Sequence, residues 1–170
     1  MKSITLPVFY QATLPPMESD FDEATEIRKR AGRITSASAA IEELMVAIIA
    51  ATLFEEVVRR RELVVGSMLR SDWCSFAAKR KLLSIAIKEF KLISGPSKEE
   101  LEKLLRGVSR YRNAFAHGRL VHNIDCHELH YFEGSPCVRR LDDTYFEELE
   151  HVFLSAWSEL QSMQEALGAS

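Results

Sequence analysis

Apolar residues recur with the period of a helix along most of the chain from Ser19 onward. Between residues 41 and 57, two apolar stripes lie side by side, which predicts a central helix surrounded by protein. We expect this helix to begin near Asp20 and to run to about Arg61, with Gly32 as a point where it could break.

The next two predicted helices lie on either side of a Gly-Pro link. The first runs from about residue 72 to residue 90, and a Ser-Gly-Pro tripeptide ends it. Ser97 is expected to begin the second, because Glu100 three residues later completes a capping box. Its apolar stripe should stop at Gly118, since glycine is the usual residue just past the end of a helix.

The pattern changes after Gly118. Segments 128–133 and 137–141 contain aromatic and β-branched residues and flank a Gly-Ser-Pro turn, which predicts a small β-hairpin. A last helix is expected to start at about Asp142 and to carry apolar residues as far as Leu167. The predicted fold class is therefore all-α: an up-and-down helical bundle of four main helices, with a small β-hairpin before the last helix.

Length and composition favour a single domain. A chain of 170 residues, 46% of them hydrophobic, can form a core without disulfides or a structural metal. We expect residues 1–18, which contain three prolines, to be an irregular arm and residues 19–170 to be one helical domain. No stretch reaches the roughly 18 uninterrupted apolar residues of a membrane span, and the N-terminus lacks the plan of a signal peptide. Three cysteines, an odd number without repeated spacing, favour a soluble protein in the reducing cytoplasm.

The net charge of -3 is distributed unevenly along the chain. Residues 1–119 contain 20 Lys and Arg against 15 Asp and Glu, whereas residues 120–170 contain 2 against 10. The first part could therefore face an anion, although most basic clusters are solvated helix faces.

Arg112 stands out in the third predicted helix. It lies about 20° from Leu101 around the helix axis, in the middle of the apolar stripe. A buried charge without a partner costs several kcal/mol, so Arg112 must meet a carboxylate, face a cleft or lie in an interface. Glu55, which is equally unusual on the apolar stripe of the first helix, is the candidate for a structural ion pair with Arg112.

Asn113 and His117 are four residues apart and should share one face of the helix. Arg112 and His117 are separated by about 140°, so joint action needs a distorted helix end near Gly118 or a second copy of the chain. Arginine stabilises charge on a phosphoryl group, histidine exchanges protons near neutral pH, and asparagine can orient either one. Arg112, Asn113 and His117 are therefore candidate catalytic residues for phosphodiester chemistry that uses no metal and no cofactor.

A second group of residues could bind zinc. It consists of His122, Cys126, His127, His130 and Cys137, five potential ligands within 16 positions. No Cys-x-x-Cys pair is present among them, and surface imidazoles and small apolar thiols explain the same residues. We therefore expect no metal at this group.

The segment Arg-Asn-Ala-Phe-Ala-His at 112–117 resembles the signature of the HEPN superfamily, in which an Arg, usually followed by a polar residue, precedes a His with four to six residues between them. Residues 75–82 before the Gly-Pro link, together with Glu42-Glu43-Leu44 in the long first helix, are similar to the mannitol operon repressor-like branch. The resemblance covers about residues 20–165, and its specific part is the six-residue motif.

This resemblance implies two alternative functions. Many HEPN proteins are metal-independent endoribonucleases of toxin–antitoxin or phage-defence systems, and their Arg and His line a cleft at a homodimer interface. Arg112 would then stabilise the transition state, His117 would act as acid or base, and Asn113 would position the phosphate or His117. The implied partners are a second copy, an RNA substrate and a protein such as an antitoxin. The alternative is a non-catalytic regulatory or interaction module, like the mannitol repressor-like branch.

Overall fold

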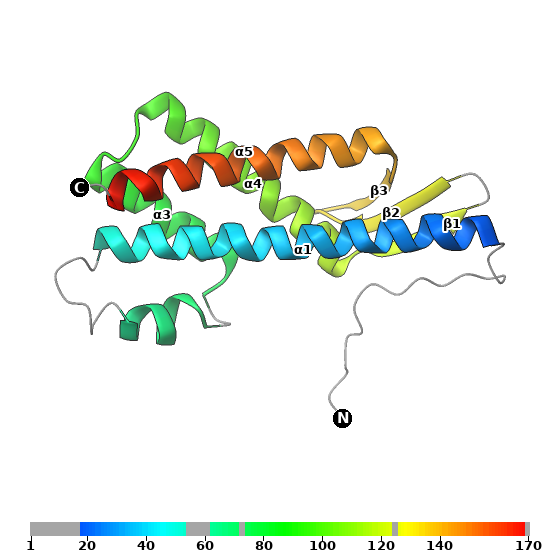
Figure 1. Cartoon of the computed structure of the whole chain (residues 1–170), viewed down its shortest axis with the longest axis horizontal. Coiled ribbons are helices and arrows are strands. Elements are labelled where there is room, and N and C mark those ends of the chain that lie inside the picture. Colours follow the sequence, from blue (N-terminus) through cyan, green and yellow to red (C-terminus); the bar gives the residue numbers. More distant parts are fainter. Residues whose placement is uncertain (1–17, 54–61, 72–73, 124–125, 169–170) are drawn as a thin grey trace. The chain divides into compact units, whose positions relative to one another are not determined.

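The computed structural model describes residues 18–53, 62–71, 74–123 and 126–168 (Figure 1). The protein is mostly helical, with a small antiparallel sheet before the last helix. The elements in chain order are α1 (Glu18–Leu53), η1 (Val65–Leu69), α3 (Phe76–Phe90), α4 (Gly95–His117), β1 (Arg119–Asn123), β2 (Cys126–Phe132), β3 (Pro136–Arg140) and α5 (Asp143–Gly168). Residues 1–17 of the expected arm and Glu55 lie outside the described residues, and Glu18, predicted as the end of the arm, is the first residue of α1.

The predicted helices are present, but several ends differ from those expected. α1 continues through Gly32 without a break. The Ser75 side chain caps α3 by accepting a hydrogen bond from the Ala78 amide at 3.2 Å. α3 ends at Phe90, because Lys91 adopts the left-handed conformation that terminates a helix. The short π-helical segment η1 was not predicted.

The start of α4 corrects the predicted capping box. The helix begins at Gly95, so Ser97 lies inside its first turn and is not the cap. The Lys98 amide donates to the Ser94 carbonyl at 2.9 Å, and the Ser94 and Ser97 hydroxyls are 3.1 Å apart. Pro96 fits this first turn, because the amides there have no partner within the helix and a missing N–H costs nothing.

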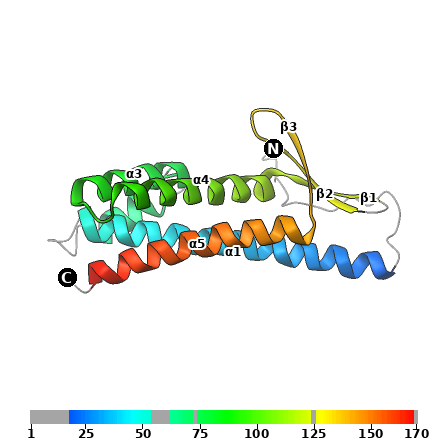
Figure 2. The same cartoon turned by 90° about the horizontal axis from the view of Figure 1, so that it is seen from above.

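The sheet has three strands, whereas a two-stranded hairpin was predicted. β2 and β3 form that hairpin, and β1 is an additional strand that pairs with the other edge of β2. Figure 2 shows β1 following the end of α4 and β3 leading into α5. Side chains alternate between the two faces of the sheet. Leu120 and Leu129, which lie opposite each other, are buried on what we call the inner face.

The chain divides into two compact units, each of which contains part of α1, α4 and α5. The first consists of the described residues up to Ala37 together with Arg110–His151, and the second of Ser38–Ser109 together with the described residues from Val152 onward. The four-helix bundle and the single domain at 19–170 stay predictions.

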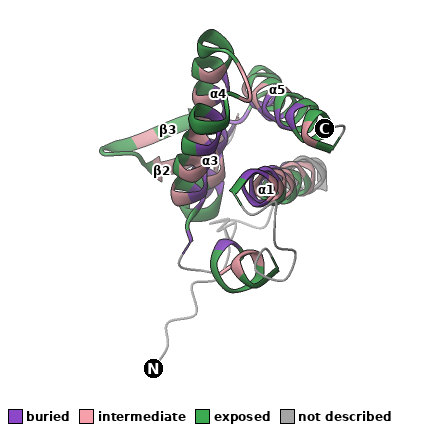
Figure 3. Ribbon diagram, turned by 90° about the vertical axis from the view of Figure 1, so that its left-hand side faces the viewer, coloured by how far each residue is buried: buried purple, intermediate pink, exposed green. Residues whose placement is uncertain are grey.

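The core of the second unit is built from one side of each of its helices. Figure 3 shows buried residues on one side of the helices and exposed residues on the other. Burial of each large aliphatic side chain contributes about 1.5–3 kcal/mol. The largest fully buried side chains here are Ile41, Met45, Ile48 and Ile49 of α1, Leu83 of α3, Leu101 and Leu105 of α4, and Leu160 of α5.

The first unit has an aromatic core between its helices and the inner face of the sheet. The Phe115 ring of α4 lies 6.4 Å from the Phe146 ring of α5. Arg30 of α1 lies with its guanidinium carbon 4.8 Å from the centre of the Phe146 ring, and its Nη1 is 2.9 Å from Asp143 Oδ1. This arginine therefore connects the start of α5 to α1 within the unit.

Among the described residues, the stretch Thr25–Leu53 within α1 is long and apolar enough to cross a membrane. Its best 18-residue window has a mean hydropathy of 1.6, and half of that window is buried in the protein. The core helices of soluble proteins share these properties, so the finding is compatible with a soluble protein.

Candidate functional site

The candidate site begins at the C-terminal end of α4. The helix is regular to His117, and the Gly118 amide donates to the Ala114 carbonyl at 2.8 Å. Gly118 lies so close to β2 that an added Cβ would be 2.8 Å from Leu129 Cδ1, and it would also lie 2.2 Å from the Ala114 oxygen. Glycine is therefore required here by close approach, and α4 ends where the sequence predicts.

The three predicted catalytic residues all lie in the last two turns of α4. Asn113 and His117 are exposed, whereas Arg112 is half-buried. The regular helix excludes the distorted end that would have brought Arg112 and His117 together within one chain. The two side chains therefore leave the helix about 140° apart, and a joint site of Arg112 and His117 would need a second copy. The ion pair between Arg112 and Glu55 stays a prediction, because Glu55 is not described.

Arg110 shares the exposed face of Asn113 and His117. It precedes Asn113 by three residues and His117 by seven, which places the three within about 60° of one another on the helix. All three side chains are exposed. The sequence already contains the spacing of Arg110, Asn113 and His117, but Arg112 was predicted as the arginine of the site, because a charge on the apolar stripe is unusual.

An aromatic cluster lies beside this face. The Arg110 guanidinium carbon is 5.0 Å from the centre of the Tyr111 ring, and the Tyr111 and Tyr145 rings meet edge to face at 5.8 Å. Burial raises the pKa of Tyr145 well above its ordinary value, and the neighbouring Tyr111 and Tyr131 add to this. The positive charges of Arg110 and Arg139 act in the opposite direction on this pKa.

Arg139 reaches this cluster from β3. A hydrogen bond with the Tyr131 side chain is the main cause that raises the pKa of Arg139. The register explains the contact: Arg139 is opposite Leu129 and Tyr131 is opposite Cys137, so Arg139 and Tyr131 are diagonal neighbours on the inner face. Sequence analysis did not find Arg139, because its position depends on the pairing of two strands.

The five potential zinc ligands are divided between the two faces of the sheet. His122 and His127 are directly opposite on the inner face, with their Nδ1 atoms 3.2 Å apart. Cys137 is also on the inner face, but it lies opposite Tyr131, four residues along β2 from His127. Cys126 and His130 are on the outer face, where His130 Nε2 lies 2.9 Å from Glu128 Oε2. In the described part of the chain, no group of three or more His, Cys, Asp or Glu residues is placed to hold a metal ion.

Comparison of the chain with family models, with curated proteins and with solved structures found no match. The candidate site therefore rests on the sequence motif and on the geometry of α4, the sheet and the start of α5.

Proposed function

We propose that this protein is a HEPN-like homodimer that cleaves RNA without a metal ion. The observation that carries the proposal is the solvent-exposed face formed by Asn113 and His117 at the end of α4. An imidazole at an exposed helix end can reach a substrate phosphodiester, and an amide four residues earlier can orient either the imidazole or the phosphate.

The roles of the residues follow from their chemistry. His117 accepts the proton of the attacking 2'-hydroxyl or donates one to the leaving oxygen. Arg112, contributed by the second copy, stabilises the negative charge of the transition state with its planar guanidinium. The dimer interface would include the half-buried side of α4 around Arg112. Each chain would form an up-and-down bundle of four helices. The proposed location is the cytoplasm, and an antitoxin is a proposed protein partner.

The proposal is tested by cleavage of structured and unstructured RNA in EDTA. Wild type should leave 2',3'-cyclic phosphate ends, and DNA should survive because it lacks the attacking hydroxyl. His117→Ala should lose about 10² to 10⁴ in rate, since it removes a general acid or base. His151→Ala, which removes an exposed histidine of α5, is the matched control and should cleave as wild type does.

Equal background cleavage by wild type and His117→Ala would overturn the catalytic proposal. One feature favours the non-catalytic alternative in that event: in one chain, the regular helix holds Arg112 and His117 on different sides. The motif would then serve a dimer interface and a partner surface, as in the mannitol repressor-like alternative.

A further inference from the structure

Two arginines from separate elements lie beside the tyrosines of the first unit. Arg110 comes from α4, and its guanidinium carbon is 5.0 Å from the centre of the Tyr111 ring, which meets the Tyr145 ring edge to face. Arg139 comes from β3, where it is a diagonal neighbour of Tyr131 on the inner face of the sheet. The positive charges of both arginines act against the rise in the pKa of Tyr145.

Neither arginine has a carboxylate partner among the described residues. The carboxylates that form ion pairs in the first unit have other partners: Glu26 pairs with Lys29 and Arg30, Asp143 pairs with Arg30, and Glu128 lies against His130. Arg110 and Arg139 are both exposed. Their remaining N–H donors are therefore directed to solvent, where an anion could accept them.

Cations are scarce in the C-terminal part of the chain. Residues 120–170 carry only two cations, Arg139 and Arg140, against ten carboxylates. Both lie on β3, and Arg139 is on the inner face beside the tyrosines whereas Arg140 is on the outer face opposite Glu128. Positive charge in this acidic part of the chain is thus confined to β3.

The two arginines also lie near the proposed catalytic histidine. Arg110 is seven residues before His117, so the two lie within about 20° around the helix and about 10 Å apart along its axis. An RNA strand with its scissile phosphate at His117 would therefore bring a neighbouring phosphate toward Arg110.

We propose that Arg110 and Arg139, supported by Tyr111, Tyr131 and Tyr145, form a binding subsite for a backbone phosphate of RNA beside His117. The inference rests on the proposed function for the identity of the ligand. A planar guanidinium offers paired N–H donors that match two oxygens of one phosphate. The phenol hydroxyls of Tyr131 and Tyr145 can donate to the same group.

The test measures binding of a fluorescently labelled RNA oligonucleotide by anisotropy, in the His117→Ala background so that the RNA stays intact. Arg110→Gln and Arg139→Gln should each raise the Kd about tenfold, the size expected for one charged hydrogen-bonding group. Each should also reduce the slope of log Kd against log salt by about one. Arg139→Lys should recover part of the affinity, because it keeps the charge but loses the planar donors.

Arg140→Gln is the matched control, since it removes the same charge one residue away on the opposite face of β3. It should stay within about twofold of the parent Kd, because its guanidinium does not face the tyrosines. DNA of the same sequence should show the same dependence on Arg110 and Arg139, since the contact is with phosphate. Equal effects of Arg139→Gln, Arg110→Gln and Arg140→Gln would overturn the subsite.

The outcomes separate the subsite from the catalytic proposal. RNA binding that depends on Arg110 and Arg139, with cleavage that is insensitive to His117→Ala, would support the subsite and overturn catalysis. Cleavage that depends on His117, with RNA binding that is unchanged in both arginine variants, would support catalysis and overturn the subsite. Arg110 and Arg139 are exposed, so circular dichroism should show unchanged helical content and melting in both variants.

Discussion

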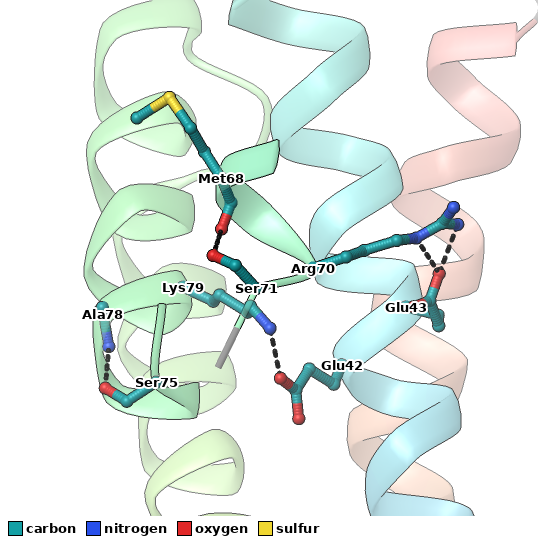
Figure 4. A network of polar contacts seen from close by, with 8 residues as sticks. All are labelled: Glu42, Glu43, Met68, Arg70, Ser71, Ser75, Ala78 and Lys79. Atoms are coloured by element: carbon teal, nitrogen blue, oxygen red, sulfur yellow. Dashed lines mark hydrogen bonds and ion pairs between the residues drawn. The ribbon is translucent and has the colours of Figure 1, made fainter. Parts of the chain in front are cut away.

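Lys79 of α3 forms an ion pair with Glu42 of α1, and the two side chains are only 6% and 20% exposed (Figure 4). Arg70 and Glu43 form a second ion pair nearby in the same unit, at 2.7 Å, but with both side chains more than half exposed. These two ion pairs, one largely buried and one solvated, offer a direct comparison of the two environments.

Lys79→Met should destabilise the protein by about 3–5 kcal/mol, because it leaves the Glu42 carboxylate without its partner in a largely buried place. Arg70→Met should cost less than about 1 kcal/mol, since water screens the exposed pair. Chemical denaturation of both variants measures the difference. A double variant, Lys79→Met with Glu42→Leu, should recover much of the loss, because it removes both charges. Equal losses for Lys79→Met and Arg70→Met would contradict the burial argument.

Gly118→Ala should destabilise the protein by about 1–3 kcal/mol, because the added methyl group would collide with Leu129 and with the Ala114 carbonyl. Gly32→Ala in α1 is the control: an added Cβ there meets nothing within 4 Å, and alanine favours a helix over glycine by about 0.5–1 kcal/mol. Thermal melting should move in opposite directions for the two variants. A Gly118→Ala protein as stable as wild type would show that α4 and β2 separate easily.

Tyr145 should make the protein sensitive to alkaline pH. Burial raises its pKa in the folded state, whereas the unfolded chain loses the phenol proton near pH 10. Above about pH 10 the unfolded state therefore binds fewer protons, and the free energy of unfolding falls as pH rises, by at most about 1.4 kcal/mol per pH unit for this group. Urea denaturation between pH 8 and 11 should show a steeper fall for wild type than for Tyr145→Phe. Parallel curves would mean that this phenol titrates normally in the folded state.

The proposed active site requires a second copy, because one regular helix separates Arg112 from His117. We expect sedimentation analysis to find a dimer at tens of micromolar. Mixing inactive Arg112→Ala and His117→Ala proteins should restore part of the cleavage, since one of the two sites in a mixed dimer keeps both residues. A monomer at these concentrations would contradict the shared site.

The sequence predicted the elements whose signals are local. Gly118 marked the end of α4, and the helical period placed Asn113 and His117 on one face. β1 was missed because the five residues Arg-Leu-Val-His-Asn at 119–123 combine one short apolar pair with polar neighbours, which is too weak a pattern for a strand. The start of α4 was misplaced because Ser97 and Glu100 look like a cap even when the helix begins earlier.

The candidate site was less predictable, because its parts come from distant segments. Arg139 and Tyr131 become neighbours only through the register of β2 and β3, and the charge of Arg139 acts on the pKa of Tyr145 only in the folded chain. No spacing in the sequence encodes such a meeting. The pair of Lys79 with Glu42 was missed for the same reason, since its two members are 37 residues apart on different helices.

The division of the chain into two interleaved units has a consequence for its synthesis. The described residues up to Ala37 belong with Arg110–His151, and α5 from Val152 onward belongs with residues that leave the ribosome much earlier. The first unit therefore cannot complete its core before residues 110–151 are made, and the second cannot do so before the end of α5 is made. A ribosome that stops at His151 would release a chain whose second unit lacks Phe153, Ala156, Leu160 and Met163 from its core.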